Sequence, residues 1–511
     1  MIKISKLVSI LIVSQNMVLG IDPFDIYQIF YKNSYSIKIQ NENLNEKEGV
    51  LDYADGYFDW NALSSLTSGM QYRLPTIDEQ EFTSSALDDL QIRDDSFSFG
   101  LNKQFKFGSS LSPSIIMKKA ISNLPLVNDA YDLNLQLLFK QPLTRAKRSY
   151  AKSMYESSKL DFKSEKSRTK YIFSNQLYYV LSAYFDYVFS VLNHKIYLRS
   201  EHKSKQFYKE TLELIKADIR PESDINQLEA DLLEKKISLI ESEQIVKEYK
   251  SVLCKFLSIN FNIFDNYDSE FEVLDSIFYE KELPTIPKEN LIRIALKNRN
   301  DIKSASLNIK STDILQQSAK SYLLPDIYLQ ALYNINGFDV GSSFNDVLSN
   351  SDTHITDFGL SLNLNYSFSN KFARGQYKQA KAIKNKAKYY YDNKKMNIEL
   401  DVITAIDNFN SSRKALEHVI KSYYKYQNVL ENEKYKFKEG RTTLVELLIL
   451  QDKLIMAELN LSVFKCEYLK SIIRLKHDMG LLTPMKEFSR EDLNDHFIST
   501  KDFFTLTEVS R

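Results

Sequence analysis

Two stretches of this chain, about 220 residues apart, repeat one order of sequence patterns. Each has an alternation of apolar and polar residues, then a long amphipathic pattern of helical period, then a break and a shorter helical pattern. The first copy predicts a strand over 133–139, a helix over 146–219, a break at Pro221 and a helix over 224–257. The second predicts a strand over 360–366, a helix over 375–439, a break at Gly440 and a helix over 444–480. The sequence therefore predicts a duplicated unit with a few long elements.

Composition agrees with long elements, because only 12 glycines and 10 prolines interrupt the 511 residues. A mainly helical protein is expected. Lysine plus arginine equals aspartate plus glutamate at 67 each, which leaves no basic excess for phosphate backbones, so we expect no nucleic-acid partner. Cys254 and Cys466 lie at similar places in the two shorter helices without metal-binding neighbours, and we expect packed thiols rather than a disulfide.

The N-terminus has two lysines followed by the apolar run 7–13 and by Gly20. This pattern predicts a signal peptide over 1–20, with an ordinary apolar segment as the alternative. Elsewhere no 18 consecutive residues are apolar, so any membrane crossing would have to use strands. We divide the remainder into a first structural repeat over 21–270, a second over 271–482 and a C-terminal tail over 483–511.

The long helical patterns carry apolar residues at alternating steps of four and three, which is typical of a coiled-coil seam. In the second long helix these residues include Ile398, Val402, Ala405, Phe409, Ser412 and Leu416. The last helix carries two such stripes, which indicates neighbours on two sides, as in a closed ring of helices. Helical segments over 24–51 and 289–322 have the length to extend the shorter helices end to end. A wall of this kind has open edges and predicts a cyclic oligomer.

Strand-like segments over 326–336 and 357–368 bracket a polar loop, and Leu360, Leu362 and Leu364 alternate there with polar residues. This alternation is typical of a membrane barrel strand, although a half-buried soluble sheet gives the same pattern. The first half has room for four strand-like runs, near 57–72, 96–107, 110–118 and 131–139. Whether the extra pair forms an external hairpin stays open, and Trp60 is a candidate for a membrane interface.

Three segments, in this order and spacing, resemble the TolC-type outer-membrane efflux family. They are 290–302 followed by Ala319 and 324–326, the strand-to-helix junction 139–143, and the hairpin tip 435–448 with its counterpart 219–225. The resemblance covers nearly the whole chain. It implies a mainly α fold with a β-barrel, in which long coiled-coil hairpins form an α-barrel tunnel continuous with a shared transmembrane β-barrel. The assembly would be a homotrimer, each chain would have an internal two-fold repeat, and two strands from each half would suffice for the barrel.

This resemblance also implies a function. The protein would be the outer-membrane channel component of a tripartite efflux or type I secretion system. It would passively conduct substrates from a periplasmic adaptor (membrane fusion) protein and an inner-membrane transporter to the exterior. The barrel would contact outer-membrane lipid and the tunnel would lie in the periplasm. The alternative is a non-conducting exported coiled-coil scaffold. Neither the six histidines nor any glycine-rich or nucleophile motif indicates catalysis, so we expect no catalytic residue, metal or cofactor.

The resemblance places a periplasmic gate at Glu446, Asp224 and Phe437. Read residue by residue, the two carboxylates are better explained as favourable groups in the first turn of a helix. The family has a further carboxylate one turn after Glu446, where this chain has Ile449, so a double acidic ring is in doubt. Residues at the hairpin tips are candidates for adaptor contact: Arg220, Pro221, Gly440, Arg441 and Thr442. The two arginines could instead be solvated or pair with neighbouring tips, and Gly440 is expected to adopt a positive φ.

Overall fold

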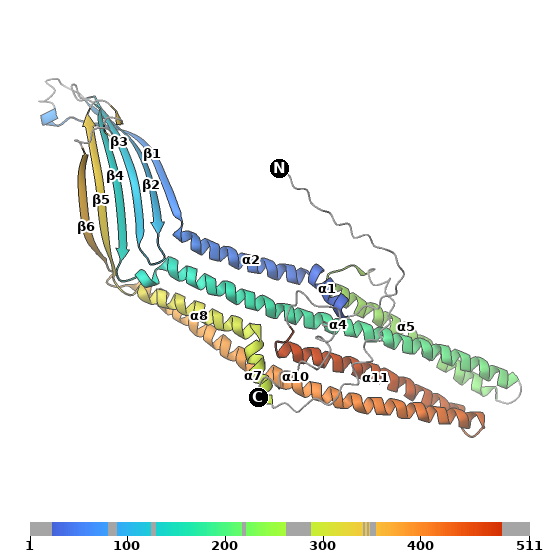
Figure 1. Ribbon diagram of the computed structural model, residues 1–511. Helices are drawn as coiled ribbons and strands as arrows, with labels where there is room; N and C mark the ends of the chain where they lie inside the picture. The colour runs from blue at the N-terminus through green and yellow to red at the C-terminus, as the bar shows by residue number, and fades with distance from the viewer. Residues whose placement is uncertain are drawn as a thin grey trace. The chain divides into compact units, whose positions relative to one another are not determined.

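The computed structural model describes residues 23–79, 89–123, 129–216, 221–261, 288–340, 343–344, 347 and 354–482. As predicted, the described chain is mainly helical and contains one antiparallel sheet (Figure 1). The predicted signal peptide over 1–20 and tail over 483–511 lie outside the described residues. Among the described helices, none combines the length and the apolar character that a membrane crossing requires.

The chain forms two compact units. The hairpin unit comprises Met1–Glu42, Ser167–Ile302 and Asn393–Arg511, and the strand unit comprises Asn43–Lys166 and Lys303–Asp392. These units cut across the two predicted repeats, because each half of the sequence contributes its strands to the strand unit and its return helix to the hairpin unit. The repeat boundaries themselves stay a prediction.

The strand unit contains a six-stranded sheet in which strands follow one another in sequence order, β1-β2-β3-β4-β5-β6 (Figure 1). All neighbouring pairs are antiparallel. The strands are β1 (Trp60–Arg73), β2 (Leu90–Gln104), β3 (Ser110–Ser122), β4 (Ala130–Pro142), β5 (Asp326–Val340) and β6 (His354–Asn365). All four strand-like runs of the first half are therefore strands of one continuous sheet.

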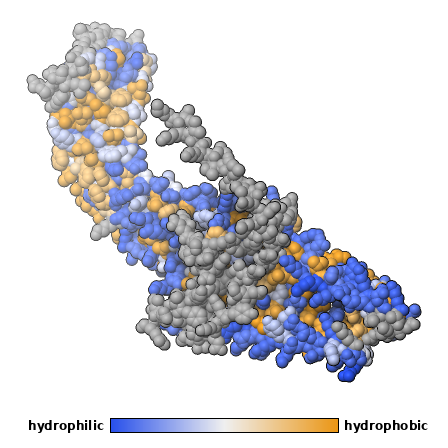
Figure 2. All heavy atoms as spheres, turned by 45° about the vertical axis from the view of Figure 1, so that its right-hand side comes forward, coloured by the Kyte–Doolittle hydropathy of each residue, from blue (hydrophilic) through white to orange (hydrophobic). Residues whose placement is uncertain are grey.

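The register keeps apolar side chains on one face of this sheet across every pair of strands. Leu364 lies opposite Ile327, Tyr333 opposite Leu137, and Phe97 opposite Leu66. Because directly paired residues point to the same face, these leucines and aromatics share a surface while asparagine, serine and glutamine line the other. Many of them are exposed, such as Leu360 and Leu362 at 63% and 68%. Figure 2 shows apolar residues gathered over the strands.

The two strand-to-helix junctions lie together in the strand unit. The Thr144 hydroxyl donates to the Pro325 carbonyl at 2.7 Å and accepts from the Ile327 N–H at 3.1 Å. The Arg145 guanidinium donates to the Leu324 carbonyl at 2.5 Å. Side chains that directly follow the segment 139–143 therefore bind main-chain groups in and beside the segment 324–326.

Two long helical hairpins dominate the hairpin unit (Figure 1). The first joins α4 (Tyr150–Lys216) to α5 (Ser223–Leu257), and the second joins α10 (Lys371–Lys438) to α11 (Leu444–Asp478). The outgoing helices have 67 and 68 residues and the return helices 35 each, as the sequence predicted. The predicted seam is buried over its central part, for example at Leu177, Ile398 and Phe409.

Several predicted boundaries were wrong. The segment 24–51 is two helices, α1 (Pro23–Asn33) and α2 (Tyr35–Asp55), and 289–322 is also two, α7 (Lys288–Asn298) and α8 (Asn300–Ser321). The long helix predicted from 375 begins at Lys371, because Gly375 has open space around its Cα and is tolerated inside the helix. A short 3-10 turn, Ala146–Arg148, precedes α4, which begins at Tyr150 rather than at 146.

The break between α1 and α2 lies at the end of the return helix α5, and the break between α7 and α8 lies at the end of the return helix α11. The Tyr35 N–H at the first break donates to the Ser258 hydroxyl, the C-cap of α5, at 3.4 Å. At the second break, Gly480 after α11 lies against Arg299, where an added Cβ would be 2.8 Å from the Arg299 nitrogen. Short and return helices thus meet end to end, which is the arrangement expected from their lengths.

Gly480 generates the first prediction. Its φ of +71° disfavours a side chain, and an added methyl would collide with the main chain of Arg299. Gly480→Ala is therefore expected to lower the free energy of unfolding by about 2–4 kcal/mol through strain and overpacking. Thermal unfolding of the purified protein measures this as a lowered Tm.

Gly375→Ala is the matched control, since Gly375 lies within α10 with no atom near its added Cβ. Its Tm should be unchanged or slightly raised, because alanine adds about 0.5–1 kcal/mol of helix propensity to the free energy of unfolding. Equal Tm values for the two variants would contradict the close contact at Gly480.

Candidate functional site: the hairpin tips and the polar cluster

The tip of the first hairpin carries two of the predicted site residues within the described chain. Pro221 is exposed, and its carbonyl accepts from the Asp224 N–H at 3.2 Å. Asp224 lies in the first turn of α5 and is half-buried, where its charge favours the helix N-terminus. Arg220 lies outside the described residues.

The second tip reverses the chain at Gly440, whose φ is +69°. The Gly440 N–H donates to the Phe437 carbonyl at 3.1 Å, and the Arg441 N–H donates to the Lys436 carbonyl at 2.8 Å. These two bonds close the end of α10 in the manner of a glycine C-cap. The predicted positive φ of Gly440 is confirmed, and Arg441 is exposed beside it.

Thr442, Thr443 and Glu446 form a capped helix start. The Thr443 hydroxyl accepts from the Glu446 N–H at 3.3 Å, and the Glu446 carboxylate accepts from the Thr443 N–H at 3.4 Å and from the Thr442 hydroxyl at 2.6 Å. This is a capping box, so Glu446 has a structural partner whatever else it does. The hydrogen bonds from Thr442 and Thr443 lower the pKa of Glu446, which keeps this exposed carboxylate ionised at neutral pH.

A second carboxylate lies beside it. Hydrogen bonds from Thr442 and Lys436 lower the pKa of Glu433 near the end of α10. The charge of Glu433 acts on the pKa of Glu446 in the opposite direction, so the two negative side chains lie close together. The sequence pattern placed Glu433 on a helical seam without indicating this pairing. Position 449 is an exposed isoleucine in the next turn of α11.

Phe437 lies in the core of the tip rather than at its surface. It is 9% exposed and clusters with Leu228, Leu430, Leu444 and Leu447. Its ring centroid is 5.8 Å from that of Phe207 on α4. Within one chain its packing therefore joins the two hairpins, and a gate role for this aromatic ring stays a prediction.

Ion pairs also join the hairpins. Arg199 on α4 donates to Glu458 on α11 at 2.6 Å. Lys235 on α5 pairs with Asp452 on α11 and, at 3.3 Å, with Asp231. Burial lowers the pKa of Lys235, but the two carboxylates more than reverse this, so the net shift is upward. Sequence reasoning missed the pairs Arg199–Glu458 and Lys235–Asp452, because each joins residues on different hairpins.

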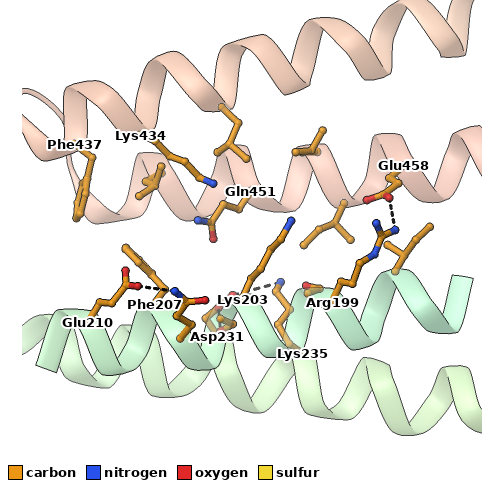
Figure 3. Close-up of a pocket in the computed structure, with 18 residues that line it drawn as sticks. Arg199, Lys203, Phe207, Glu210, Asp231, Lys235, Lys434, Phe437, Gln451 and Glu458 are labelled. Atoms are coloured by element: carbon orange, nitrogen blue, oxygen red, sulfur yellow. Dashed lines mark hydrogen bonds and ion pairs between the residues drawn. The ribbon is translucent and has the colours of Figure 1, made fainter.

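A cavity of about 450 Å³ lies between the hairpins beside these pairs. Figure 3 shows Lys203 from the first hairpin and Lys434 from the second reaching toward this space, with Gln451 between them. Its walls mix both charges with the apolar side chains of the Phe207–Phe437 cluster. The arrangement holds the two hairpins against each other.

A buried polar cluster surrounds the break between α7 and α8. The Arg299 guanidinium pairs with Asp301 at 2.8 Å and lies 3.8 Å from Asp478, and all three side chains are almost fully buried. Arg474 binds Asp478 at 2.6 Å and Lys394 reaches Asp301 at 3.4 Å. Such pairs are tolerated in a core only when each charge has partners, and these charges do.

His477 lies beside this cluster. Its Nδ1 is 2.8 Å from the Ser174 hydroxyl, and its ring stacks on Tyr178 at 5.8 Å. Burial, with the positive charges of Arg299 and Arg474, lowers the pKa of His477 to about 3 despite the opposing charge of Asp301. The histidine is therefore neutral in the folded protein at neutral pH.

The remaining candidates for chemistry are few. Cys254 and Cys466 are free and buried, as predicted, and burial raises the pKa of Cys466 to about 12. Within the described ranges, no group of three or more histidine, cysteine, aspartate or glutamate side chains could hold a metal ion. The site is thus a set of charged and capping residues at the tips, with a buried charge cluster elsewhere in the same unit.

Comparison with solved structures identifies the fold. Among solved structures, the fold is similar to three outer-membrane channels. They are CmeC of Campylobacter jejuni (TM-score 0.63, 14% identity, 94% of this chain and 90% of that one), the open state of MtrE of Neisseria gonorrhoeae (0.63, 14%, 91% and 91%) and OprN (0.63, 14%, 90% and 89%). No curated protein matches the sequence. The described chain has the fold of an outer-membrane channel.

A family model matches part of the sequence. Residues 291–481 match the family model described as outer membrane efflux protein. This span includes β5, β6 and the whole second hairpin. The resemblance to the TolC-type outer-membrane efflux family is therefore confirmed, and its known members are channels.

His477 generates a pH prediction. Its folded pKa of about 3 lies below the value near 6.5 of an unfolded histidine, so the unfolded chain binds a proton that the folded one does not. Stability is fully present above pH 6.5 and falls as the pH decreases, by about 2–3 kcal/mol at pH 4.5. Between pH 7 and pH 4.5, the Tm of His477→Gln should fall by less than the Tm of wild type.

The control is His418→Gln, on an exposed position of α10, which should keep the wild-type dependence on pH. Identical profiles for wild type and His477→Gln would show that the buried imidazole does not resist protonation.

Proposed function

We propose that this chain is the outer-membrane channel of a tripartite efflux or type I secretion system. Substrates would pass through it without energy input of its own, from a periplasmic adaptor protein and an inner-membrane transporter to the exterior. The observation that carries this proposal is the sheet, whose six strands have one largely apolar face opposite a largely polar face. A surface of that kind matches lipid on one side and an aqueous lumen on the other.

A homotrimer is supported by apolar surface that one chain leaves uncovered. On α5, Leu233, Ile237 and Ile240 recur at steps of four and three, and they are 53%, 58% and 68% exposed. A seam of this spacing packs against a neighbouring helix in coiled coils. The return helix of the first hairpin would therefore contact a long helix of the next copy, and three copies would close a helical tunnel in the periplasm.

Adaptor contact is proposed at the tips, through Pro221, Gly440, Arg441 and Thr442 and through Arg220. The described members of this set lie in turns that end the hairpins, and Pro221, Gly440 and Arg441 are exposed. Their backbone positions are held by capping bonds, so a partner would meet a pre-organised surface.

The gate is proposed at Glu446, with Asp224 at the other tip and Phe437 packed behind. In a three-fold assembly, copies of Glu446 would bring like charges together at the narrow end and attract cations. Glu433 would add to this negative potential through its position beside Glu446. The capping box fixes the carboxylate in place, so Glu446 would both cap α11 and contribute to ion selectivity.

Glu446→Gln separates these two roles. Glutamine keeps the capping-box pattern but removes the charge. Single-channel recording in planar bilayers should show a cation-selective pore whose cation preference drops by about twofold or more in the variant. Glu467→Gln, exposed on the same helix about 30 Å away along its axis, should leave selectivity unchanged.

Three outcomes would decide the proposal. Selectivity unchanged in Glu446→Gln would remove this residue from the gate while keeping the channel. A protein that never forms pores, and that remains soluble without detergent, would favour the non-conducting scaffold. A heat-modifiable trimer in the outer-membrane fraction would contradict the scaffold.

A further inference from the structure

The first strand pair of the sheet, β1 and β2, continues the two-faced pattern of the other four strands. Leu66 pairs with Phe97 and Ala62 with Leu101 on the apolar face. Ser65 pairs with Ser98 and Asn61 with Asn102 on the polar face, and the Ser65 and Ser98 hydroxyls are 2.8 Å apart. Over residues 61–66 this pair therefore resembles the strands that follow, apart from Leu63 on the polar face. Farther along, Ser68 pairs with Asp95 and Met70 with Arg93 on the otherwise apolar face.

Strand β2 is paired along both of its sides. Its ladder to β1 runs from Lys103 to Leu90, and its ladder to β3 runs from Gln104 to Ile92. Folding β1 and β2 away from the sheet would break the second ladder and expose main-chain N–H and C=O groups at membrane depth. Groups left unpaired in hydrocarbon cost several kcal/mol each. The ladder between β2 and β3 therefore keeps β1 and β2 in the same sheet as the other strands.

The sheet ends at β1 on one side and at β6 on the other. Since the number of strands is even and every neighbouring pair is antiparallel, β6 of one copy runs antiparallel to β1 of a second copy placed at the next position in a ring. The two edges also match in length, with 14 and 12 residues. Their apolar faces then lie on the same side, so a head-to-tail ring keeps one apolar surface outside.

Side chains on the two edges are complementary in size. On its apolar face β6 carries bulky residues, Phe358, Leu360 and Leu362, whereas β1 alternates Leu66 with the small residues Ser64 and Ser68. Large and small residues on facing strands pack together without crowding. Both edges are exposed along the described chain, as expected for surfaces that a second copy covers.

We propose that β1 of each copy pairs with β6 of the next, so that the shared barrel contains six strands from each chain. This inference rests on the proposed trimer. Three copies would supply eighteen strands, where two strands from each half of each chain would supply twelve. Barrel diameter grows roughly in proportion to strand number, so the exit pore would be about half as wide again. A lumen of this width would leave the selective step to the periplasmic end.

Cysteine cross-linking tests the pairing in full-length protein. In a background with Cys254→Ala and Cys466→Ala, one variant carries Ser65→Cys on β1 and a second variant carries a cysteine on the polar face of β6, at Asp357, Ser361 or Asn363. The two are co-expressed in one strain and treated with a short bifunctional thiol reagent. At least one β6 position should give a covalent dimer of the two variants on a denaturing gel.

The matched control moves the first cysteine to Ser114 on the polar face of β3. Dimers from β3 with β6, and none from β1, would overturn the inference and place β1 and β2 outside the barrel. Ser65→Cys combined with Ser98→Cys in one chain proves that these positions react. If that pair reacts and no β1–β6 dimer forms at any position, the edges do not pair between copies.

Mass photometry of the native protein in detergent separately measures the mass of the particle and so the number of chains in it. A trimer without β1–β6 dimers contradicts only the strand pairing and keeps the proposed channel. A monomeric particle that gives no β1–β6 dimer contradicts both the pairing between copies and the proposed trimer.

Discussion

Main-chain hydrogen bonding at the edges of the sheet is the constraint on which the strand unit depends. Inside the sheet each strand bonds to its neighbours through main-chain groups, and the register keeps one face largely apolar across the five pairs. At β1 and β6 the chain offers donors and acceptors to a further strand. A flat exposed edge promotes aggregation in most proteins, and closing a ring removes it. The apolar face requires a lipid-like surrounding and the edges require copies of the chain, so both features point to the same assembly.

The hairpin unit meets a different constraint, the mismatch between long outgoing and short return helices. Short helices α1 and α7 lie at the free ends of α5 and α11, and in both places the chain uses a left-handed residue, Ser258 or Gly480. The second of these junctions is stabilised by the buried Arg299 cluster. Charge pairs there specify which helix ends meet, because only the correct arrangement gives each buried charge a partner.

The sequence predicted the elements well where periodicity was strong. Strands β3 to β6 and both hairpins appear within a few residues of their predicted positions, and Gly440 adopts the expected positive φ. The breaks at Ser34 and Arg299 were missed because the helical pattern of apolar residues continues through them. What interrupts the helix at Arg299 is packing against Gly480, a contact between residues about 180 positions apart. No local pattern carries that information.

The candidate site was likewise predictable from the sequence only in part. The capping box could be inferred from Thr443 and Glu446 at a spacing of three, and Asp224 from its place in a first turn. The association of Glu433 with Glu446 depends on how α10 and α11 meet, and the pairs of Lys235 and Arg199 depend on how the two hairpins pack. The periodic seam shows which face of α10 carries Phe437, but it does not show the partner of this ring on the other hairpin.

The double role of Glu446 follows from this geometry. A carboxylate that caps a helix has little freedom, because the Thr442 hydroxyl and the Thr443 N–H fix its orientation. Those bonds lower its pKa, whereas neighbouring copies in a ring would raise it by repulsion. The first effect offsets the second, so a ring of capped carboxylates could remain charged at neutral pH where a ring of free ones would partly protonate. A capped glutamate is for that reason a better source of fixed negative charge at a constriction than an unconstrained one.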